Sequence, residues 1–423
     1  MKMTESKYAI LIIFITLFFY GCDDAEKKDS SYKLSDVPSV NIDHLMYLYD
    51  DVDLPGGKSG GIVHIYSEYP DYKYEIESEE GYTCVDDVAR TMMVDAVRLS
   101  GSAEIKSKYD RMAEFLLYMQ ADNGYFHNFI WHDLSINKEY RTSLAEPNWW
   151  SWRAFWALSS FQSENDSLML RVNESCRRLA DNLFEEYLDL PKNYDTIEGV
   201  VVPNWLPLET AGDQAAVLIL GLEAYYNNIE SDPRVLKLIG KFADGLKATQ
   251  KGGAKEFPFG AYLSWQNTWH AYGNGQAYAM LRAGQLLERE DYIESALLEI
   301  NHLYPYLKYE KYIAYLSMRK LGPKYEVTGF SHFSQIAYGF RPIIWACAAA
   351  YKVTQDTKYL DRALETTKWF SGENYAQTAM YDPETGRCFD GIPSPVEINM
   401  NSGAESTVEA LLSLQVFESL KDD

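Results

Sequence analysis

The sequence has few cysteines and no closely spaced pair of them. After Cys22 come Cys84, Cys176, Cys347 and Cys388, and none of these forms a C-x-x-C motif. Protein metal sites built on cysteine usually need such spacing, so we expect no metal site and no cofactor. In an oxidising compartment the four could form up to two disulfides, but a core of this size does not need them. We therefore expect them to be buried as small apolar residues.

The sequence also lacks a basic patch. Its 423 residues carry a formal net charge of −23. Binding to nucleic acid needs clustered lysine and arginine, so the composition argues against a nucleic-acid partner. The same charge repels an acidic polymer unless a local basic pocket overrides it. A neutral partner fits this composition best.

The one long apolar run is short for a membrane span. It covers Ala9 to Tyr20, follows two lysines and ends at Gly21-Cys22, which indicates an export signal. The Gly-Cys ending resembles the bacterial lipoprotein signal, in which Cys22 becomes the lipidated first residue. This resemblance implies a signal peptide over residues 1–21, a polar tether over 22–36, and an outer-membrane lipoprotein on the periplasmic or cell-surface face, attached by its lipid alone. A plain signal peptide with an incidental cysteine is the alternative.

From residue 37 to 423 there is no Pro/Gly/Ser-rich linker and no low-complexity tract, so we expect a single domain. Apolar residues recur at intervals of three and four nearly throughout, which predicts an all-α fold. The expected helices cover residues 85–100, 105–120, 149–163, 168–188, 209–227, 233–249, 271–288, 290–307, 334–353, 357–371 and 403–418.

These helices come in pairs joined by short turns, at a spacing of roughly 60 residues. Such repeats form either an open solenoid or a closed double ring. The units resemble one another too little for a regular solenoid, so an α/α barrel with inner and outer helices is the better match. The longer loops, rich in aromatic and polar residues, fall at the same end of alternate helices. In a closed ring that end is one mouth of the barrel.

The stretch from Glu80 to Arg90 opens the first long helix. Thr83 and Asp86 have the spacing of a capping box, and acids suit the first turn of a helix. Asp86 and Asp87 point about 100° apart on a helix, so they cannot make the same contact. We expect one to cap the helix or pair with Arg90 and the other to face a cavity. The alternative is a well-capped helix whose acids only pair with Arg90.

Aromatic residues gather at the helix entries. The sequence has 10 tryptophans and 33 tyrosines, and flat aromatic faces beside acids and amides suit the apolar and hydroxyl faces of a sugar. A neutral carbohydrate is therefore the expected partner. The tryptophans expected to line its cleft are Trp149, Trp150, Trp152, Trp205, Trp265 and Trp269.

Carboxyl groups at the same helix entries could supply acid and base. Cleavage of a glycosidic bond uses one carboxyl that holds a proton and one that is ionised. The acids at the expected mouth are Asp86, Asp87, Glu146, Asp213 and Glu405. Other proton carriers there are Tyr82, His270, Tyr272 and His332, and His270 could equally be a catalytic group or a sugar contact.

Four short motifs together resemble a known family. They are GYTCVDDVAR (81–90), RAFWAL (153–158), CFDG (388–391) and NSGAEST (401–407). They resemble the six-hairpin glycosidase-type domain of bacterial carbohydrate-active proteins, some of which are fused to glycosyltransferases. The resemblance implies an (α/α)6 barrel and most often glycoside hydrolysis with inversion. The motif-bearing acids are Asp86, Asp87 and Glu405. The chain departs from the pattern at residues 149–152, where an acid and a glycine often stand.

Taken together, these patterns predict two groups of site residues. The catalytic candidates are Asp86, Asp87, Asp213 and Glu405. The substrate-binding candidates are Tyr82, Arg90, Glu146, Trp149, Trp152, Trp205, Trp269, His270, Tyr272, His332 and Asp390. The leading hypothesis is a hydrolase of a neutral oligo- or polysaccharide. A sugar epimerase or polysaccharide lyase on the same fold, and a glycan-binding lipoprotein without catalysis, are the alternatives.

Overall fold

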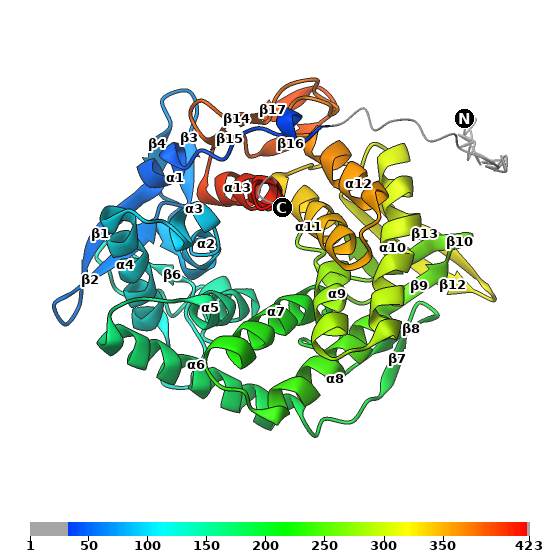
Figure 1. Cartoon of the computed structure of the whole chain (residues 1–423), viewed down its shortest axis with the longest axis horizontal. Helices are drawn as coiled ribbons and strands as arrows, with labels where there is room; N and C mark the ends of the chain where they lie inside the picture. The colour runs from blue at the N-terminus through cyan, green and yellow to red at the C-terminus, as the bar shows by residue number, and fades with distance from the viewer. Residues whose placement is uncertain (1–32, 421–423) are drawn as a thin grey trace, which may run out of the picture. The chain divides into compact units, whose positions relative to one another are not determined.

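The computed structural model describes residues 33–420. The predicted signal peptide and the predicted lipidation at Cys22 lie outside the described residues. The described residues form one compact unit, and its inner helices make a closed ring (Figure 1). Each inner helix packs on the next and the last packs on the first. The ring consists, in order, of α2 (Val85–Thr91), α5 (Trp149–Ser160), α7 (Gly212–Asn228), α9 (Gln276–Leu286), α11 (Ala337–Thr354) and α13 (Ala404–Glu418).

A second layer of helices surrounds this ring (Figure 1). Each outer helix follows an inner one in the sequence and returns antiparallel to it, which gives the paired arrangement of an (α/α)6 barrel. The outer helices are α4 (Ala103–Met119), α6 (Asp166–Tyr187), α8 (Pro233–Thr249), α10 (Glu290–Tyr309) and α12 (Thr357–Thr367). The last inner helix, α13, has no outer helix after it, and α1 (Asp43–Leu48) from the start of the unit packs against it instead.

The predicted helices agree well with these elements, because the apolar spacing reflects burial. α11 is buried along most of its length, as expected of an inner helix, whereas α8 alternates buried and exposed positions, as expected of an outer one. The prediction of one helix over 85–100 is wrong. That segment breaks after α2 and resumes as the single turn α3 (Asp95–Arg98).

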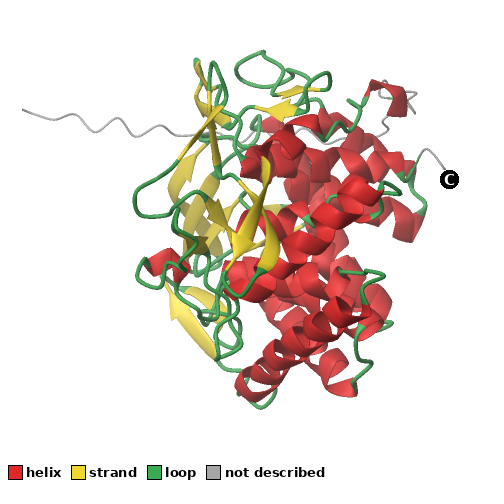
Figure 2. Cartoon of the chain, turned by 90° about the vertical axis from the view of Figure 1, so that its left-hand side faces the viewer, coloured by secondary structure: helices red, strands yellow, loops and turns green. Residues whose placement is uncertain are grey.

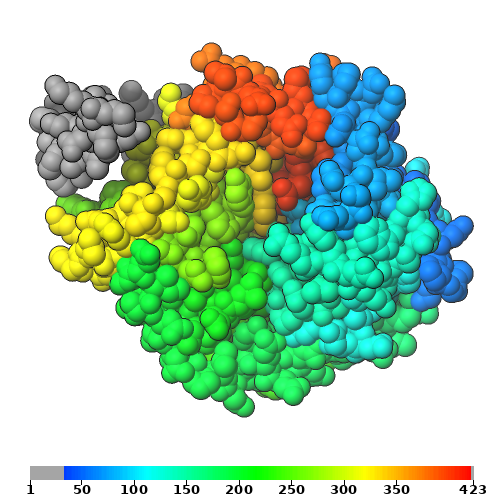
Figure 3. Space-filling view, turned by 180° about the vertical axis from the view of Figure 1, so that it is seen from behind, coloured from blue at the N-terminus to red at the C-terminus, as the bar shows by residue number. Residues whose placement is uncertain are grey.

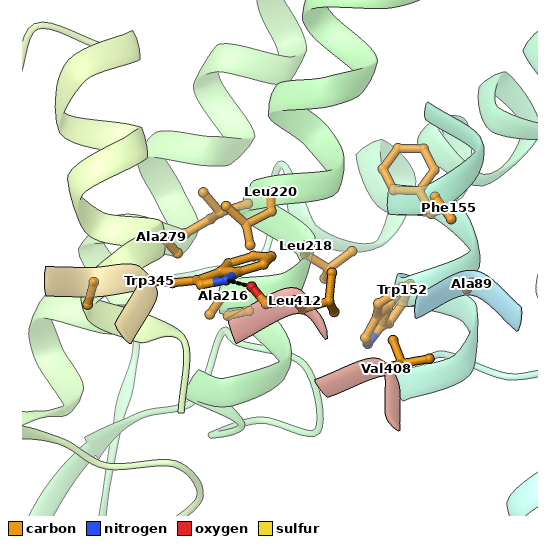
Figure 4. Close-up of a cluster of buried hydrophobic side chains, with 14 of the residues drawn as sticks. Ala89, Trp152, Phe155, Ala216, Leu218, Leu220, Ala279, Trp345, Val408 and Leu412 are labelled. Carbon is orange, nitrogen blue, oxygen red and sulfur yellow. Dashed lines mark hydrogen bonds between the residues drawn. The ribbon is translucent and has the colours of Figure 1, made fainter. Parts of the chain in front are cut away.

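The inner helices share one apolar core. Figure 4 shows Trp152 and Phe155 of α5 together with residues of α7, α9, α11 and α13. Trp345 donates its Nε1 hydrogen to the carbonyl oxygen of Leu412, at 2.7 Å, so its one polar atom is satisfied inside the core. Packing of this kind closes the ring without any disulfide. Among the described residues, all four cysteines are buried and free, as predicted.

The strands form antiparallel pairs, which gather at one end of the helices (Figure 2). Most sheets have two strands, and one has three. The three-stranded sheet consists of β11 (Thr268–His270), β12 (Tyr315–Leu321) and β13 (Lys324–Ser331). The two-stranded pairs are β1 (Tyr49–Leu54) with β2 (Lys58–Val63), β3 (Tyr66–Glu68) with β4 (Lys73–Glu75), β5 (Thr83–Cys84) with β6 (Phe129–Ile130), β7 (Tyr194–Ile197) with β8 (Val200–Pro203), β9 (Gln250–Gly253) with β10 (Glu256–Tyr262), β14 (Tyr381–Asp382) with β15 (Arg387–Cys388), and β16 (Gly391–Ser394) with β17 (Glu397–Asn399).

The start of α2 differs from the predicted capping box. Thr83 lies in β5, and its hydroxyl donates to the carbonyl oxygen of Val63 at 2.7 Å. The residue that caps α2 is Cys84, whose sulfur accepts the backbone N–H of Asp87 at 3.4 Å. The helix begins at residue 85, as predicted, but its cap is Cys84 and not Thr83, because Thr83 takes part in strand pairing.

No helix within residues 33–420 is long and apolar enough to cross a membrane.

One buried carboxyl in the outer layer makes stability depend on pH. Glu299 of α10 is fully buried, and burial raises its pKa to about 8. One of its oxygens accepts the backbone N–H of Tyr262 at 3.0 Å, and the other has no partner. The unfolded chain loses this proton near pH 4.3, so between about pH 4.3 and pH 8 only the folded state holds it. Stability is therefore greatest below this window and falls as the pH rises through it.

Glu299→Gln should remove this loss, because glutamine has no proton to release. We expect the variant to match the parent at pH 4.5 and to be more stable at pH 8.5 by about 2–4 kcal/mol. Urea unfolding at the two pH values measures the difference. Glu294→Gln, at an exposed position of the same helix, is the matched control. An equal effect of Glu299→Gln at both pH values would contradict this account.

Candidate active site

Arg90 binds four carboxyl groups at the start of the inner helices. Its Nη2 lies 2.6 Å from Asp87 Oδ1 and 3.2 Å from Asp86 Oδ2. Its Nη1 lies 3.0 Å from Glu405 Oε2 and 3.2 Å from Glu409 Oε1. Asp86 and Asp87 come from α2, and the two glutamates come from α13. One guanidinium therefore joins the first inner helix to the last, where the ring closes.

Two further arginines complete this cluster. Arg153 of α5 pairs with Asp86, and Arg341 of α11 pairs with Glu409. Tyr338 of α11 accepts a hydrogen bond from Arg153 through its hydroxyl oxygen. The guanidinium carbons of Arg90, Arg153 and Arg341 lie 5.4, 5.2 and 5.4 Å from the centre of the Tyr338 ring. Three cations thus surround one aromatic ring, an arrangement that attracts each of them.

The charge cluster, defined as Arg90, Arg153, Arg341 and the carboxyls of Asp86, Asp87, Glu405 and Glu409, holds three cations and four acids. Within this cluster the pKa values of the two aspartates shift in opposite directions. Burial raises the pKa of Asp87 to about 6, and although Arg90 opposes this, the carboxyls of Asp86 and Glu405 add to it. Burial also acts on Asp86, but Arg153 and Arg90 outweigh it and hold the pKa of Asp86 below its ordinary value.

The prediction that one aspartate would be free of Arg90 is therefore wrong. Both carboxylates bind it, because the side chain of Arg90 lies between residues three and four positions back on the same helix. The carboxyls that bind Arg90 differ in environment instead. Asp87 is 2% exposed, whereas the side chain of Glu405 is 45% exposed and reaches the solvent.

A second pair of titratable groups lies at the start of α7. His270 Nε2 is 3.0 Å from Asp213 Oδ2, and the Nδ1 of His270 is enclosed without a partner. Asp213 is buried, and its other oxygen accepts the backbone N–H of Gln214 at 2.7 Å. The buried carboxylate fixes one ring nitrogen of the imidazole, as in sites where histidine transfers protons.

The segment after His270 links this pair to the charge cluster. Burial, with the nearby carboxylate of Glu405, raises the pKa of Tyr272. Gly273 has a φ of +61°, and a Cβ there would lie 2.1 Å from the hydroxyl of Tyr338, so only glycine fits between them. A cavity of about 30 Å³ lies beside Gly273, with Arg90, Arg153 and Tyr338 in its wall. Such a volume holds a water molecule and no sugar.

The face that carries the strands and loops is seen in Figure 3. Segments coloured blue, teal, yellow and red, which lie far apart in the sequence, meet around a recess near its middle. The structure places Asp87 and Glu405 on one guanidinium and so does not separate them to opposite ends of the barrel. Trp149 lies beside Arg153 of the charge cluster, with its ring 4.8 Å from the guanidinium carbon.

The prediction that six tryptophans line the cleft is wrong for most of them. Trp152 and Trp205 are enclosed in the core, where their Nε1 atoms donate to Gln214 and to the carbonyl oxygen of Lys241. Trp150 is also buried, with its Nε1 bonded to the carbonyl oxygen of Phe126. Trp269 is buried on β11. Only Trp149, which is half-buried, and Trp265, which is 45% exposed, can meet a ligand.

The other predicted binding residues are placed as follows. Tyr82 is buried, and burial raises its pKa to about 12. Glu146 is half-buried and accepts a hydrogen bond from Asn148 at 3.3 Å. His332 lies beside Phe330, with ring centres 4.8 Å apart. Asp390 holds the start of α13, because its Oδ1 accepts the N–H of Gly403 at 2.9 Å and the hydroxyl of Ser406 at 2.6 Å.

The site-residue prediction missed Arg153, Tyr338, Arg341 and Glu409, although Arg153 stands in a quoted motif. Glu409 follows Glu405 by one helical turn, so the two face the same side of α13. That spacing could have revealed Glu409. Tyr338 and Arg341 gave no local signal, because their partners come from other helices.

No protein-family model matches the chain, and no curated protein matches it in sequence. Solved structures do match its fold. A sugar epimerase from a ruminal bacterium is 12% identical, with a TM-score of 0.59 over 88% of this chain and 94% of that one. Cellobiose 2-epimerase from Spirochaeta thermophila is 12% identical, with a TM-score of 0.58 over 86% and 91%. A family 76 glycoside hydrolase, a mannosidase from Bacteroides thetaiotaomicron, is 11% identical, with a TM-score of 0.53 over 89% and 96%. The fold is therefore the predicted (α/α)6 barrel.

Proposed function

We propose that the chain is an enzyme that hydrolyses a glycosidic bond in a neutral oligosaccharide, with Asp87 and Glu405 as its two carboxyls. One observation carries the proposal. Both carboxyls bind Arg90, yet Asp87 is buried with a pKa raised to about 6, whereas Glu405 is half-exposed. Glycosidases use two such unlike carboxyls, one to protonate the leaving oxygen and one to activate water.

In this proposal Asp87 is the general acid and Glu405 the general base. Arg90 binds both Asp87 and Glu405 and so orients them, and Asp86, which pairs with Arg153, also binds Arg90. Trp149, beside Arg153, offers a partly exposed aromatic face to a sugar ring. The structural neighbours include sugar epimerases and a mannosidase, which supports a carbohydrate substrate.

A sugar epimerase is the second candidate, and the Asp213–His270 pair favours it. A carboxylate that fixes one nitrogen of an imidazole prepares the histidine to remove a proton from carbon. Tyr272 lies next to it, with ring centres 6.0 Å apart. Hydrolysis by two carboxyls needs no additional base such as His270.

Incubation in D₂O with a panel of untagged neutral oligosaccharides separates the candidates. Hydrolysis gives shorter products. Epimerisation leaves the length unchanged and brings deuterium into the sugar ring. A protein that only captures glycans gives neither change but binds the ligand. The hydrolase proposal fails if no member of the panel is shortened at any pH at which the protein is folded.

We further propose that the protein is exported and held at the outer membrane by lipid on Cys22. The Gly21-Cys22 ending of the apolar run supports this. Cys22→Ser should abolish incorporation of radiolabelled palmitate into the protein, because serine has no thiol to accept the lipid. Equal palmitate incorporation by the parent and the Ser variant would contradict lipid anchoring at this residue.

A further inference from the structure

The three-stranded sheet extends outward from His270. Its register places two cross-strand rows of side chains on the same face, because directly paired residues of antiparallel strands share a face. One row consists of Thr268, Ser317 and Gly329, and the next of His270, Tyr315 and Ser331. Trp265 pairs with Thr268 across the tight turn before β11 and so continues the first row.

This face of the sheet is open to solvent. Trp265 is 45% exposed and Tyr315 is 39% exposed. The alternate residues Trp269 and Leu316 are buried, because they point to the core on the opposite face. Two large aromatic side chains are thus held outside the core, on the side of the sheet that carries His270.

The ring of Tyr315 packs against the neighbouring strand of the sheet. A Cβ added to Gly329 would be 3.2 Å from Cε2 of Tyr315 and 3.5 Å from its hydroxyl oxygen. The ring therefore rests against the glycine of the neighbouring strand, which leaves its other side free. A larger residue at position 329 would lift the ring from this position.

The remaining groups of these two rows are uncharged hydrogen-bonding groups, and the next row on the same face holds the ion pair of Arg319 and Glu326. The hydroxyls of Thr268 and Ser317 lie 2.8 Å apart and share one hydrogen, which leaves the second hydrogen and further lone pairs for a ligand. Apart from His270, the two rows contain no ionisable side chain that is charged at neutral pH. Exposed aromatic faces beside neutral hydroxyls suit a sugar ring.

We propose that this face, the sheet shelf of Trp265, Thr268, Tyr315, Ser317 and Gly329, binds sugar rings of the substrate beyond the bond that reacts. The inference rests on the proposed function in assuming that the substrate meets the mouth beside His270. Three strands are about 10 Å across, which is room for one to two rings. The substrate is therefore an oligosaccharide chain, and the enzyme also binds sugar rings of this chain away from the reacting bond.

The test uses cello- and manno-oligosaccharides of two to six units. We expect the parent protein to prefer long chains, in kcat/KM where a chain is cleaved and in Kd where it is only bound. Tyr315→Ala and Trp265→Ala should each lower the preference for six units over two by about three- to tenfold, the worth of one aromatic contact. Gly329→Ala should lower it as well, by tilting Tyr315. Tyr315→Phe should keep it, because the ring remains.

Tyr309→Ala is the matched control, because Tyr309 is 82% exposed at the end of α10 and lies outside the shelf. If chains are cleaved without any dependence on length, the shelf is refuted and the proposed function stands. If chains are bound with the expected dependence but never cleaved, the shelf stands and hydrolysis is refuted. Equal length preference in the parent and in Tyr315→Ala would also overturn the shelf.

Discussion

Asp87→Asn should lower kcat by about 10²–10⁴-fold while the protein stays folded, because the amide keeps the shape of the side chain and cannot donate the proton. The charge cluster should tolerate the change. Without Asp87 it holds three guanidinium groups and three carboxyls, so the excess acid is removed. Steady-state kinetics on the glycan that is cleaved, with thermal unfolding of the same samples, measures both effects.

The pH profile gives a second readout of the same prediction. A general acid must be protonated, and the pKa of Asp87 is about 6. The kcat of the parent should therefore fall as the pH rises through about 6, and the residual rate of Asp87→Asn should lack that limb. Glu405→Gln should also lose turnover, through the missing base. If folded Asp87→Asn showed near-normal turnover, the proton donor would have to be Glu146 or Asp213 instead.

Arg90→Met should destabilise the fold by about 3–5 kcal/mol or prevent folding, because it leaves buried carboxylates without their cation. Arg90 is the only residue of the described chain that contacts all four carboxyls of the cluster. Asp86→Asn should also destabilise, since Arg153 loses its carboxylate. Arg90→Lys should cost less than Arg90→Met, because it keeps the charge but cannot reach every partner.

Urea unfolding of the variants measures these costs. Arg319→Met is the matched control, because Arg319 pairs with Glu326 on the surface, where both side chains are about half exposed. Such a pair contributes about 0–1 kcal/mol. If Arg90→Met cost no more than Arg319→Met, the charge cluster would not be what holds α2 to α13.

The helices could be predicted from the sequence because their apolar spacing records which side is buried. The position of the acids at helix starts could also be predicted. Asp86, Asp87, Asp213 and Glu405 all lie in first turns, where the helix dipole favours a negative charge. Asp86, Asp87 and Glu405 meet at Arg90, whereas Asp213 pairs with His270.

The partners of these acids could not be predicted from local patterns. Contacts between Arg90 and Glu409, or between Arg153 and Tyr338, exist only because the ring closes. The prediction for the tryptophans failed for a different reason, because composition does not say which side of a helix a residue takes. Helical spacing could have placed Trp152 with the buried Phe155, three positions on, and left Trp149 at the helix start.

The central claim is that Asp87 and Glu405 flank the bond that is cleaved. A crystal structure of Asp87→Asn with an intact neutral oligosaccharide tests it most directly. We predict that the side chain of residue 87 contacts the glycosidic oxygen and that a water bound to Glu405 faces the anomeric carbon. The carboxyl positions should be about 6.5–9.5 Å apart, as inversion requires. A sugar whose reacting carbon lies against His270 and Asp213, away from residue 87 and Glu405, would contradict the account.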